Sequence, residues 1–188
     1  MLIKPFLAAV VSCSAMLTGA LAHELQANRL TLVVRDDTHV SVTCFLNYTE
    51  ALHRALAPKQ TLQEFVLRSA ALSPSDFQKE LIRAQAIFSS GFKLTMPKHD
   101  GLTVSNWRWP DAQRVQADVQ ERAMQAVVGE GEHPAHGSFE VRAEATASRP
   151  ITSVGMRMPP EFGKVLVVSY KPRQTWVAPQ TGVDQIQF

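Results

Sequence analysis

Cysteine is scarce in this chain of 188 residues, since only Cys13 and Cys44 are present. Cys13 falls in the apolar N-terminal stretch, so removal of that stretch leaves Cys44 alone and excludes an intramolecular disulfide. Cys44 lies on the apolar side of an alternating pattern. A buried thiol is therefore favoured over a reactive or intermolecular one.

An excess of charge of one sign is also lacking. The chain has 19 Lys and Arg against 17 Asp and Glu, which gives a formal net charge of +2. A clustered basic excess is typical of proteins that bind nucleic acid, so no nucleic-acid partner is expected. After residue 22 no apolar run approaches the roughly 20 residues that span a bilayer, so no membrane span is expected in the mature chain.

Motifs of the common enzyme classes are missing as well. The chain contains no GxSxG, P-loop or GxGxxG pattern. Residues 23–27 begin like the zinc-protease motif HExxH but end in Ala27. The sequence gives no positive indication of an enzyme. A hydrolase whose Ser, His and carboxylate come from distant positions stays open as a third hypothesis.

The first 22 residues have the layout of an export signal. Lys4 supplies a basic start, residues 5–17 are mostly apolar, and Ala20-Leu21-Ala22 meets the small-x-small rule for cleavage. We therefore expect residues 1–22 to be removed by cleavage at Ala22 and the mature protein to be periplasmic or secreted.

Lipoprotein processing at Cys13 is the alternative, because the three residues before it resemble a lipobox. It would leave a lipid-anchored cysteine at the mature terminus. The apolar stretch before Cys13 is short for such a signal, which favours cleavage at Ala22.

Hydrophobic alternation predicts a hairpin near the start of the mature chain. Apolar residues alternate over 30–34, and the alternation resumes at Val40 after a turn at 36–38. Pairing across this turn matches apolar side chains on one face, which fixes the register. The expected pairs are Val34 with Val40, Leu32 with Val42 and Leu30 with Cys44.

Helix start signals dominate residues 49–90. Asn47, the capping box that begins at Thr61, and Ser73-Pro74 each precede a run of apolar residues at helical spacing. A further helix is predicted over 111–128, where small apolar residues repeat on one face.

Strand patterns flank these helices. Residues 92–96 and 102–109 are expected to pair as a second hairpin. Further strands are predicted over 139–146, 151–158 and 165–170, the last of them buried. Strands joined by short turns at both ends of the chain indicate an antiparallel sheet or sandwich. We therefore predict one α+β domain over 23–188 with an inserted helical block.

Export itself creates candidate metal ligands. Cleavage before His23 frees an α-amine beside the imidazole of the same residue, and this pair of nitrogens can chelate copper, nickel or zinc. The expected second ligand is His53, near the start of the first helix, or His133 and His136 in a glycine-rich loop. The alternatives are that His53 is a helix-surface residue and that the two loop histidines are solvated.

Two tryptophans, Trp107 and Trp109, share one face of a predicted strand. Such a pair can stack on a sugar or a peptide. Large aromatic side chains beside predicted helices more often fill the space between elements, so packing is the preferred interpretation.

Three segments carry a resemblance to a group of known proteins: His23-Glu24-Leu25, Arg35-Asp36, and residues 164–168 in the closing strand. They resemble small exported bacterial proteins of unassigned activity, some of which are found with membrane proteins of the HupE/UreJ metal-permease type. The resemblance implies an inner-membrane metal permease or another envelope protein as partner. It identifies no site residue.

Two functional hypotheses follow. The first is an exported, non-catalytic accessory protein that binds or delivers a metal through His23. The second is a periplasmic interaction module without metal, which docks an envelope or membrane partner through a sheet edge or through Trp107 and Trp109.

Overall fold

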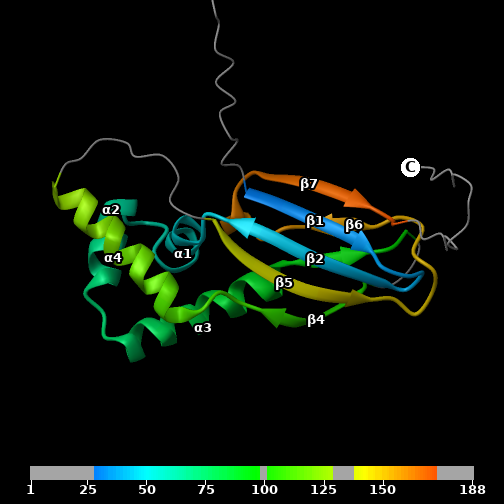
Figure 1. The fold of residues 1–188 in the computed structure, drawn as a ribbon, viewed down its shortest axis with the longest axis horizontal. Helices are drawn as coiled ribbons and strands as arrows, with labels where there is room; N and C mark the ends of the chain where they lie inside the picture. Colours follow the sequence, from blue (N-terminus) through cyan, green and yellow to red (C-terminus); the bar gives the residue numbers. More distant parts are fainter. Residues whose placement is uncertain (1–27, 98–100, 129–137, 173–188) are drawn as a thin grey trace, which may run out of the picture.

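The computed structural model describes residues 28–97, 101–128 and 138–172. Its main element is a five-stranded sheet in the order β4-β5-β2-β1-β7 (Figure 1). Neighbouring strands are antiparallel except β1 and β7, which run parallel at one edge. The strands are β1 (Asn28–Val34), β2 (His39–Leu46), β4 (Thr103–Arg108), β5 (Phe139–Thr146) and β7 (Val165–Tyr170). The predicted α+β class with a mainly antiparallel sheet is confirmed.

The predicted register of the first hairpin is also confirmed. Val34 lies opposite Val40, Leu32 opposite Val42 and Leu30 opposite Cys44, and all of these except Val34 are buried. The intervening positions of the same strands are mostly polar. The main sheet therefore has an apolar inner face and a largely polar outer face, as expected of an antiparallel sheet that faces water on one side.

The helical block predicted over 49–90 forms three helices. The side chains of Asn47, Thr61 and Ser73 accept hydrogen bonds from the first turns, and Thr61 and Glu64 complete the capping box. The helix predicted over 111–128 also forms. The helices are α1 (Tyr48–Leu56), α2 (Leu62–Ala70), α3 (Pro74–Gly91) and α4 (Ala112–Val128).

In Figure 1, α1, α2 and α4 lie beyond one end of the main sheet, and α3 runs from this cluster toward the sheet. No helix in the described part of the chain is long and apolar enough to cross a membrane.

The predicted second hairpin is wrong as a strand pair. β3 (Lys93–Thr95) pairs with β6 (Gly155–Arg157) in a separate two-stranded sheet, whereas β4 joins β5 in the main sheet. One bridge between Thr95 and Gly101 and a hydrogen bond of 2.8 Å from Leu102 N–H to the Leu94 carbonyl connect the two segments. Apolar alternation locates strands, but it does not identify the strand with which each one pairs.

The strand predicted over 151–158 is observed as the much shorter β6. Ile151 is buried and its N–H donates a hydrogen bond of 2.6 Å to the Asp37 carbonyl, so the chain is first anchored to the β1–β2 turn. The strand itself is confined to Gly155–Arg157, the three residues that pair with β3.

The prediction that residues 165–170 form a buried strand is half right. β7 is a strand, but it lies at the edge of the sheet next to β1, and Leu166 and Tyr170 are 53% and 52% exposed. The apolar run Val-Leu-Val-Val resembles strands that are covered on both faces. Its exposure is decided by what packs around it, which the run itself does not encode.

The core lies between the inner face of the main sheet and a second layer that contains α3, β3 and β6. Phe88 of α3 contacts the rings of Tyr48, Trp109 and Phe162, the last from the short 3-10 helix η1 (Pro160–Phe162). Trp107 and Trp109 stack on each other at 5.0 Å with an interplanar angle of 7°, and both are partly buried against the core. Their arrangement agrees with the packing interpretation.

Candidate functional site

Of the four histidines expected to bind a metal, His53 lies in the described residues. It is half-buried on α1, its Nε2 donates a hydrogen bond of 2.8 Å to the Gln60 carbonyl, and its ring lies 5.5 Å from that of Phe65. These contacts fit a helix-surface residue that holds the α1–α2 connection. His23, His133 and His136 lie outside the described residues. Within residues 28–97, 101–128 and 138–172, no three His, Cys, Asp or Glu side chains form a group that could hold a metal.

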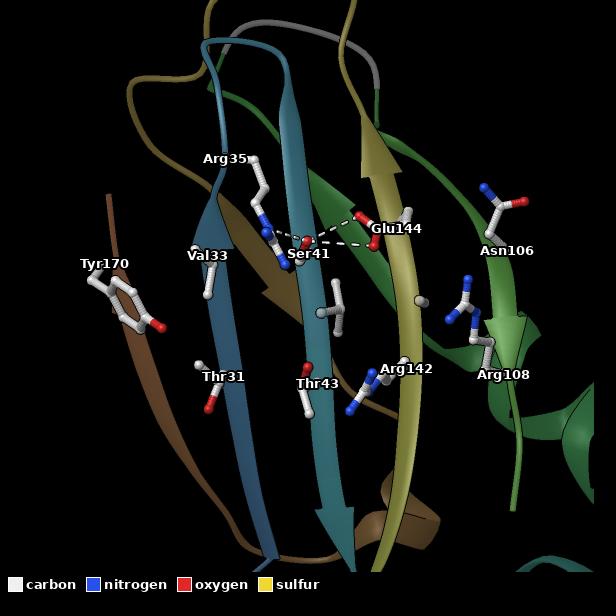
Figure 2. Close-up of a pocket in the computed structure, with 12 residues that line it drawn as sticks. Thr31, Val33, Arg35, Ser41, Thr43, Asn106, Arg108, Arg142, Glu144 and Tyr170 are labelled. Carbon is white, nitrogen blue, oxygen red and sulfur yellow. Dashed lines mark hydrogen bonds between the residues drawn. The ribbon is translucent and has the colours of Figure 1, made fainter. Parts of the chain in front are cut away.

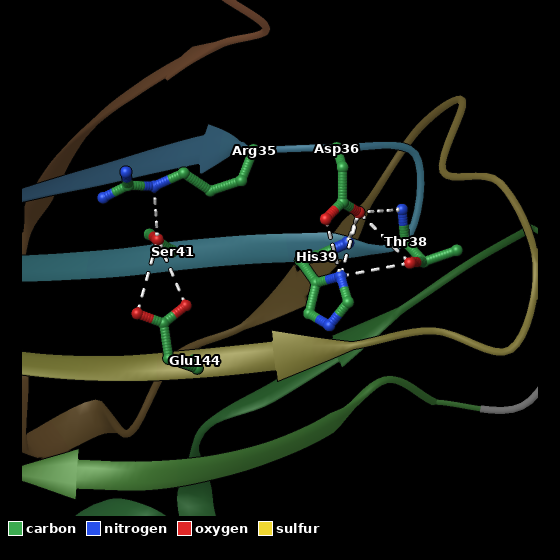
Figure 3. A network of polar contacts seen from close by, with 6 residues as sticks. All are labelled: Arg35, Asp36, Thr38, His39, Ser41 and Glu144. Carbon is green, nitrogen blue, oxygen red and sulfur yellow. Dashed lines mark hydrogen bonds and ion pairs between the residues drawn. The ribbon is translucent and has the colours of Figure 1, made fainter.

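His39 belongs to the tight turn between β1 and β2. The Asp36 carboxylate accepts hydrogen bonds from the backbone N–H of Thr38 (2.7 Å) and of His39 (2.9 Å), and it lies 2.9 Å from His39 Nδ1 (Figure 3). These bonds, that of Thr38 first, lower the pKa of Asp36 to about 2. The Thr38 hydroxyl approaches the same Nδ1 atom, at 3.1 Å. The Asp36 carboxylate and the Thr38 hydroxyl thus both contact Nδ1, whereas the histidine of a catalytic triad uses one ring nitrogen for each partner. The cluster therefore stabilises the turn and is not arranged as a catalytic triad.

The outer face of the main sheet contains a groove of about 540 Å³ (Figure 2). Most of its lining side chains carry hydroxyl, amide, guanidinium or carboxylate groups. Three of them are arginines and one is a glutamate. The lining residues are Thr31, Val33, Arg35, Ser41, Val42, Thr43, Asn106, Arg108, Arg142, Ala143, Glu144 and Tyr170.

A hydrogen-bonded chain closes one end of this groove. Arg35 Nε donates to Ser41 Oγ at 2.9 Å, and Ser41 Oγ donates to a carboxylate oxygen of Glu144 at 3.1 Å (Figure 3). Ser41 is only 8% exposed although it sits on the polar face. The chain therefore holds the Arg35 side chain above β2 and gives the Glu144 carboxylate a hydrogen-bond donor.

Farther along the groove, four polar residues form one row across the sheet. Thr31 lies opposite Thr43, Thr43 opposite Arg142, and Arg142 opposite Arg108. Figure 2 shows these side chains on the same face of β1, β2, β5 and β4. Arg142 forms an ion pair with Glu140 of its own strand. For Arg108, the described residues provide no carboxylate within 4.0 Å.

A backbone irregularity places Arg108 in this row. The register of β4 against β5 shifts between Ser105 and Arg108, and Asn106 has a positive φ of 53°. Asn is among the few residues other than Gly that adopt this conformation readily. Without the extra residue, Trp107 would lie opposite Arg142 on the outer face. The bulge turns Trp107 inward and Arg108 outward.

The second surface feature is the edge strand β7, whose outer side pairs with no strand in the described part of the chain. Leu166, Val167, Val168 and Tyr170 are each between 41% and 53% exposed. A lysine stands at each end of this strand: Lys164 precedes it, and Lys171 follows it and pairs with Asp37 at 2.7 Å.

Two reactive side-chain types are buried away from both surfaces. Cys44 is a free thiol in the core, and burial raises its pKa to about 12, so it is protonated and unreactive at neutral pH. Burial likewise raises the pKa of Tyr48. The expectation of a buried thiol is confirmed.

The sequence analysis did not single out the groove. Strand alternation places Arg35, Ser41, Thr43 and Arg142 at outward positions, and this signal was present in the sequence. No sequence pattern predicts that Arg108 lies opposite Arg142, because this alignment depends on a bulge and on the pairing of β4 with β5. No family model, curated protein or solved structure matches the chain.

Proposed function

We propose that this chain is an exported, non-catalytic interaction protein that binds an extended segment of an envelope partner along the β7 edge. The observation that carries the proposal is the exposure of four large apolar side chains on an edge strand of six residues. An edge strand offers a row of backbone N–H and C=O groups to any added strand. An apolar patch of this kind is typical of an interaction site.

In the proposed complex, an extended segment of the partner adds as a further strand next to β7. The main-chain hydrogen bonds of the edge supply affinity, and alternate side chains supply specificity. Leu166, Val168 and Tyr170 lie on the outer face next to Arg29, Thr31 and Val33 of β1. The added segment would therefore place its own alternate residues against Tyr170 and Val168, where β-branched side chains fit best.

The charges at the ends of β7 favour an acidic partner. Lys164 precedes the apolar run and Arg29 lies opposite Leu166 on β1, while Lys171 follows the run and is paired with Asp37. A segment with Asp or Glu on both sides of a β-branched run complements these charges. A second copy of this chain fits less well, because antiparallel pairing centred on Val167 and Val168 sets Lys164 of each copy opposite Lys171 of the other.

A synthetic peptide tests the proposal. The probe is a labelled peptide in which valine and threonine alternate between terminal glutamate pairs, and fluorescence anisotropy measures its binding to the mature protein. We expect Val168→Lys to weaken binding by at least about tenfold, since it sets a charge on the apolar edge. The matched control is Ile82→Lys, because Ile82 is 56% exposed on α3, away from the sheet edge.

Three results would contradict this proposal. The first is equal affinity of the wild type and Val168→Lys for the peptide. The second is equal affinity for a peptide whose glutamates are replaced by lysines. The third is a concentration-dependent dimer in sedimentation that Val168→Lys abolishes, which would make a second copy the occupant of the edge.

A further inference from the structure

We propose that Arg108 and Arg142 form a binding site for an oxyanion, a carboxylate or phosphate group carried by a small ligand, in the groove on the outer face of the main sheet. Tyr170 of β7 lines the same groove, but Arg108 and Arg142 lie on β4 and β5, so the proposal does not depend on the function proposed for the β7 edge.

The first support is that two positively charged side chains lie directly opposite each other on neighbouring strands. Arg108 and Arg142 are directly paired across β4 and β5. Directly opposite residues of antiparallel strands have Cβ atoms about 5 Å apart, so two guanidinium groups there repel each other. Glu140 pairs with Arg142, but among the described residues no carboxylate reaches Arg108. An oxyanion between the two guanidinium groups would relieve this repulsion with charge-assisted hydrogen bonds.

The second support is the bulge that creates the opposition. Regular pairing of β4 would place Trp107 opposite Arg142 and turn Arg108 toward the core. The bulge at Asn106, with its positive φ, reverses both orientations. β-Bulges next to binding sites commonly re-aim side chains in this way. Here the bulge serves the core and the groove together, because Trp107 then packs on Phe92.

The third support is the rest of the lining. The hydroxyls of Thr43 and Thr31 continue the row that begins at Arg108 and Arg142. Arg35 adds a third guanidinium, which Ser41 holds in place. Three arginines and one glutamate line the groove, and Glu140, which is not part of the lining, pairs with Arg142. Together these groups carry an excess of one positive charge. A volume of about 540 Å³ suits a small organic ligand.

The test uses two probes with different oxyanions. Citrate and pyrophosphate are titrated separately into the mature protein, and isothermal calorimetry measures the affinities at fixed ionic strength, because exposed charges are screened by salt. We expect one or both probes to bind. Arg108→Gln and Arg142→Gln should each weaken the binding by about tenfold or more.

The matched control is Arg83→Gln, which removes the same charge from the exposed surface of α3. It should leave both affinities within about twofold of the wild type. The stronger of the two probes identifies whether a carboxylate or a phosphate is the preferred group.

Thermal denaturation gives a second readout. Without ligand, Arg108→Gln should melt at or above the wild-type temperature, because one of two opposed like charges is gone. With the probe present, the wild type should gain stability and Arg108→Gln should not. The proposal is overturned if neither probe binds, if Arg83→Gln weakens binding as much as Arg108→Gln, or if both groove variants bind like the wild type.

Discussion

Asp36 shows how a single side chain can hold the first hairpin together. Its carboxylate accepts hydrogen bonds from two backbone N–H groups of the turn and contacts His39. These interactions favour the ionised form and lower its pKa from the usual 3.8 to about 2. The stabilisation is therefore fully present above about pH 3.8 and is lost as the pH falls toward 2.

Replacement of this carboxylate by an amide tests the assignment. Asp36→Asn should lower the melting temperature at pH 7, because the amide accepts weaker hydrogen bonds than the carboxylate. The difference from the wild type should shrink as the pH falls from 4 to 2, because the wild-type carboxyl takes up its proton over this range and is about half protonated at its pKa of about 2. Melting followed by circular dichroism across this range measures both effects.

Glu121→Gln is the control, since Glu121 is exposed on α4 and takes no part in the turn. It should change the melting temperature little at either pH. A destabilisation by Asp36→Asn that is equal at pH 7 and pH 2 would contradict the role given to the charge.

At the scale of elements, a buried ion pair within α4 is linked to α1 by a hydrogen bond from Thr49. Arg122 Nε donates to Asp118 Oδ2 at 2.8 Å, and the Thr49 hydroxyl of α1 donates to the same oxygen at 2.8 Å. The side chains of Arg122 and Asp118 are 9% and 12% exposed. Removal of one partner of such a pair leaves a buried charge without compensation.

We expect Asp118→Ala to reduce the free energy of unfolding by about 3 kcal/mol, because Arg122 stays buried without its carboxylate. The double variant with Arg122→Met should recover part of this loss. Urea denaturation measures the three free energies. Lys79→Ala, which breaks an exposed pair with Asp76, should have a much smaller effect. A double variant that is no more stable than Asp118→Ala would count against this account.

At the scale of the whole molecule, the two faces of the main sheet differ in what covers them. The inner face packs on the layer of α3, β3 and β6. In Figure 1, no described helix lies over the outer face, where the groove is found. Helices α1, α2 and α4 instead gather beyond one end of the sheet. Among the described residues, this arrangement leaves the outer face and the β7 edge as two accessible surfaces of one sheet.

A metal site at the mature terminus would join His23 to a histidine far away in the sequence, and it stays a prediction. Asn28 Oδ1 accepts a hydrogen bond of 2.8 Å from the N–H of Asn47, so β1 begins beside the start of α1, the helix that carries His53. If His23 is the first residue of the mature chain, Cu²⁺, Ni²⁺ or Zn²⁺ should raise the melting temperature, and one extra residue before His23 should abolish the effect.

His53→Ala tests whether His53 supplies the second imidazole, because its Nε2–H donates to the Gln60 carbonyl and its Nδ1 keeps a lone pair that can bind a metal. Stabilisation that persists in His53→Ala assigns the second imidazole to His133 or His136, and stabilisation that is lost assigns it to His53. Melting temperatures that are equal with and without each metal, in protein whose terminus is verified by mass spectrometry, would exclude the metal hypothesis.

Features that depend on neighbours along the chain could be predicted from the sequence. The register of β1 and β2 follows from apolar matching across a short turn, and the helix starts follow from Asn47, Thr61 and Ser73. In each case the deciding contacts join residues close in sequence. Local propensity and pattern are sufficient to predict such contacts.

The tertiary structure alone decided which strands pair and which faces stay open. β4 pairs with β5 and not with β3, β7 lies at an edge, and a bulge brings Arg108 opposite Arg142. These outcomes depend on contacts between residues far apart in sequence, whose free energy is set by packing around a shared core. The alternation of side chains along a strand assigns each one to a face of the sheet, but it does not specify what packs against that face.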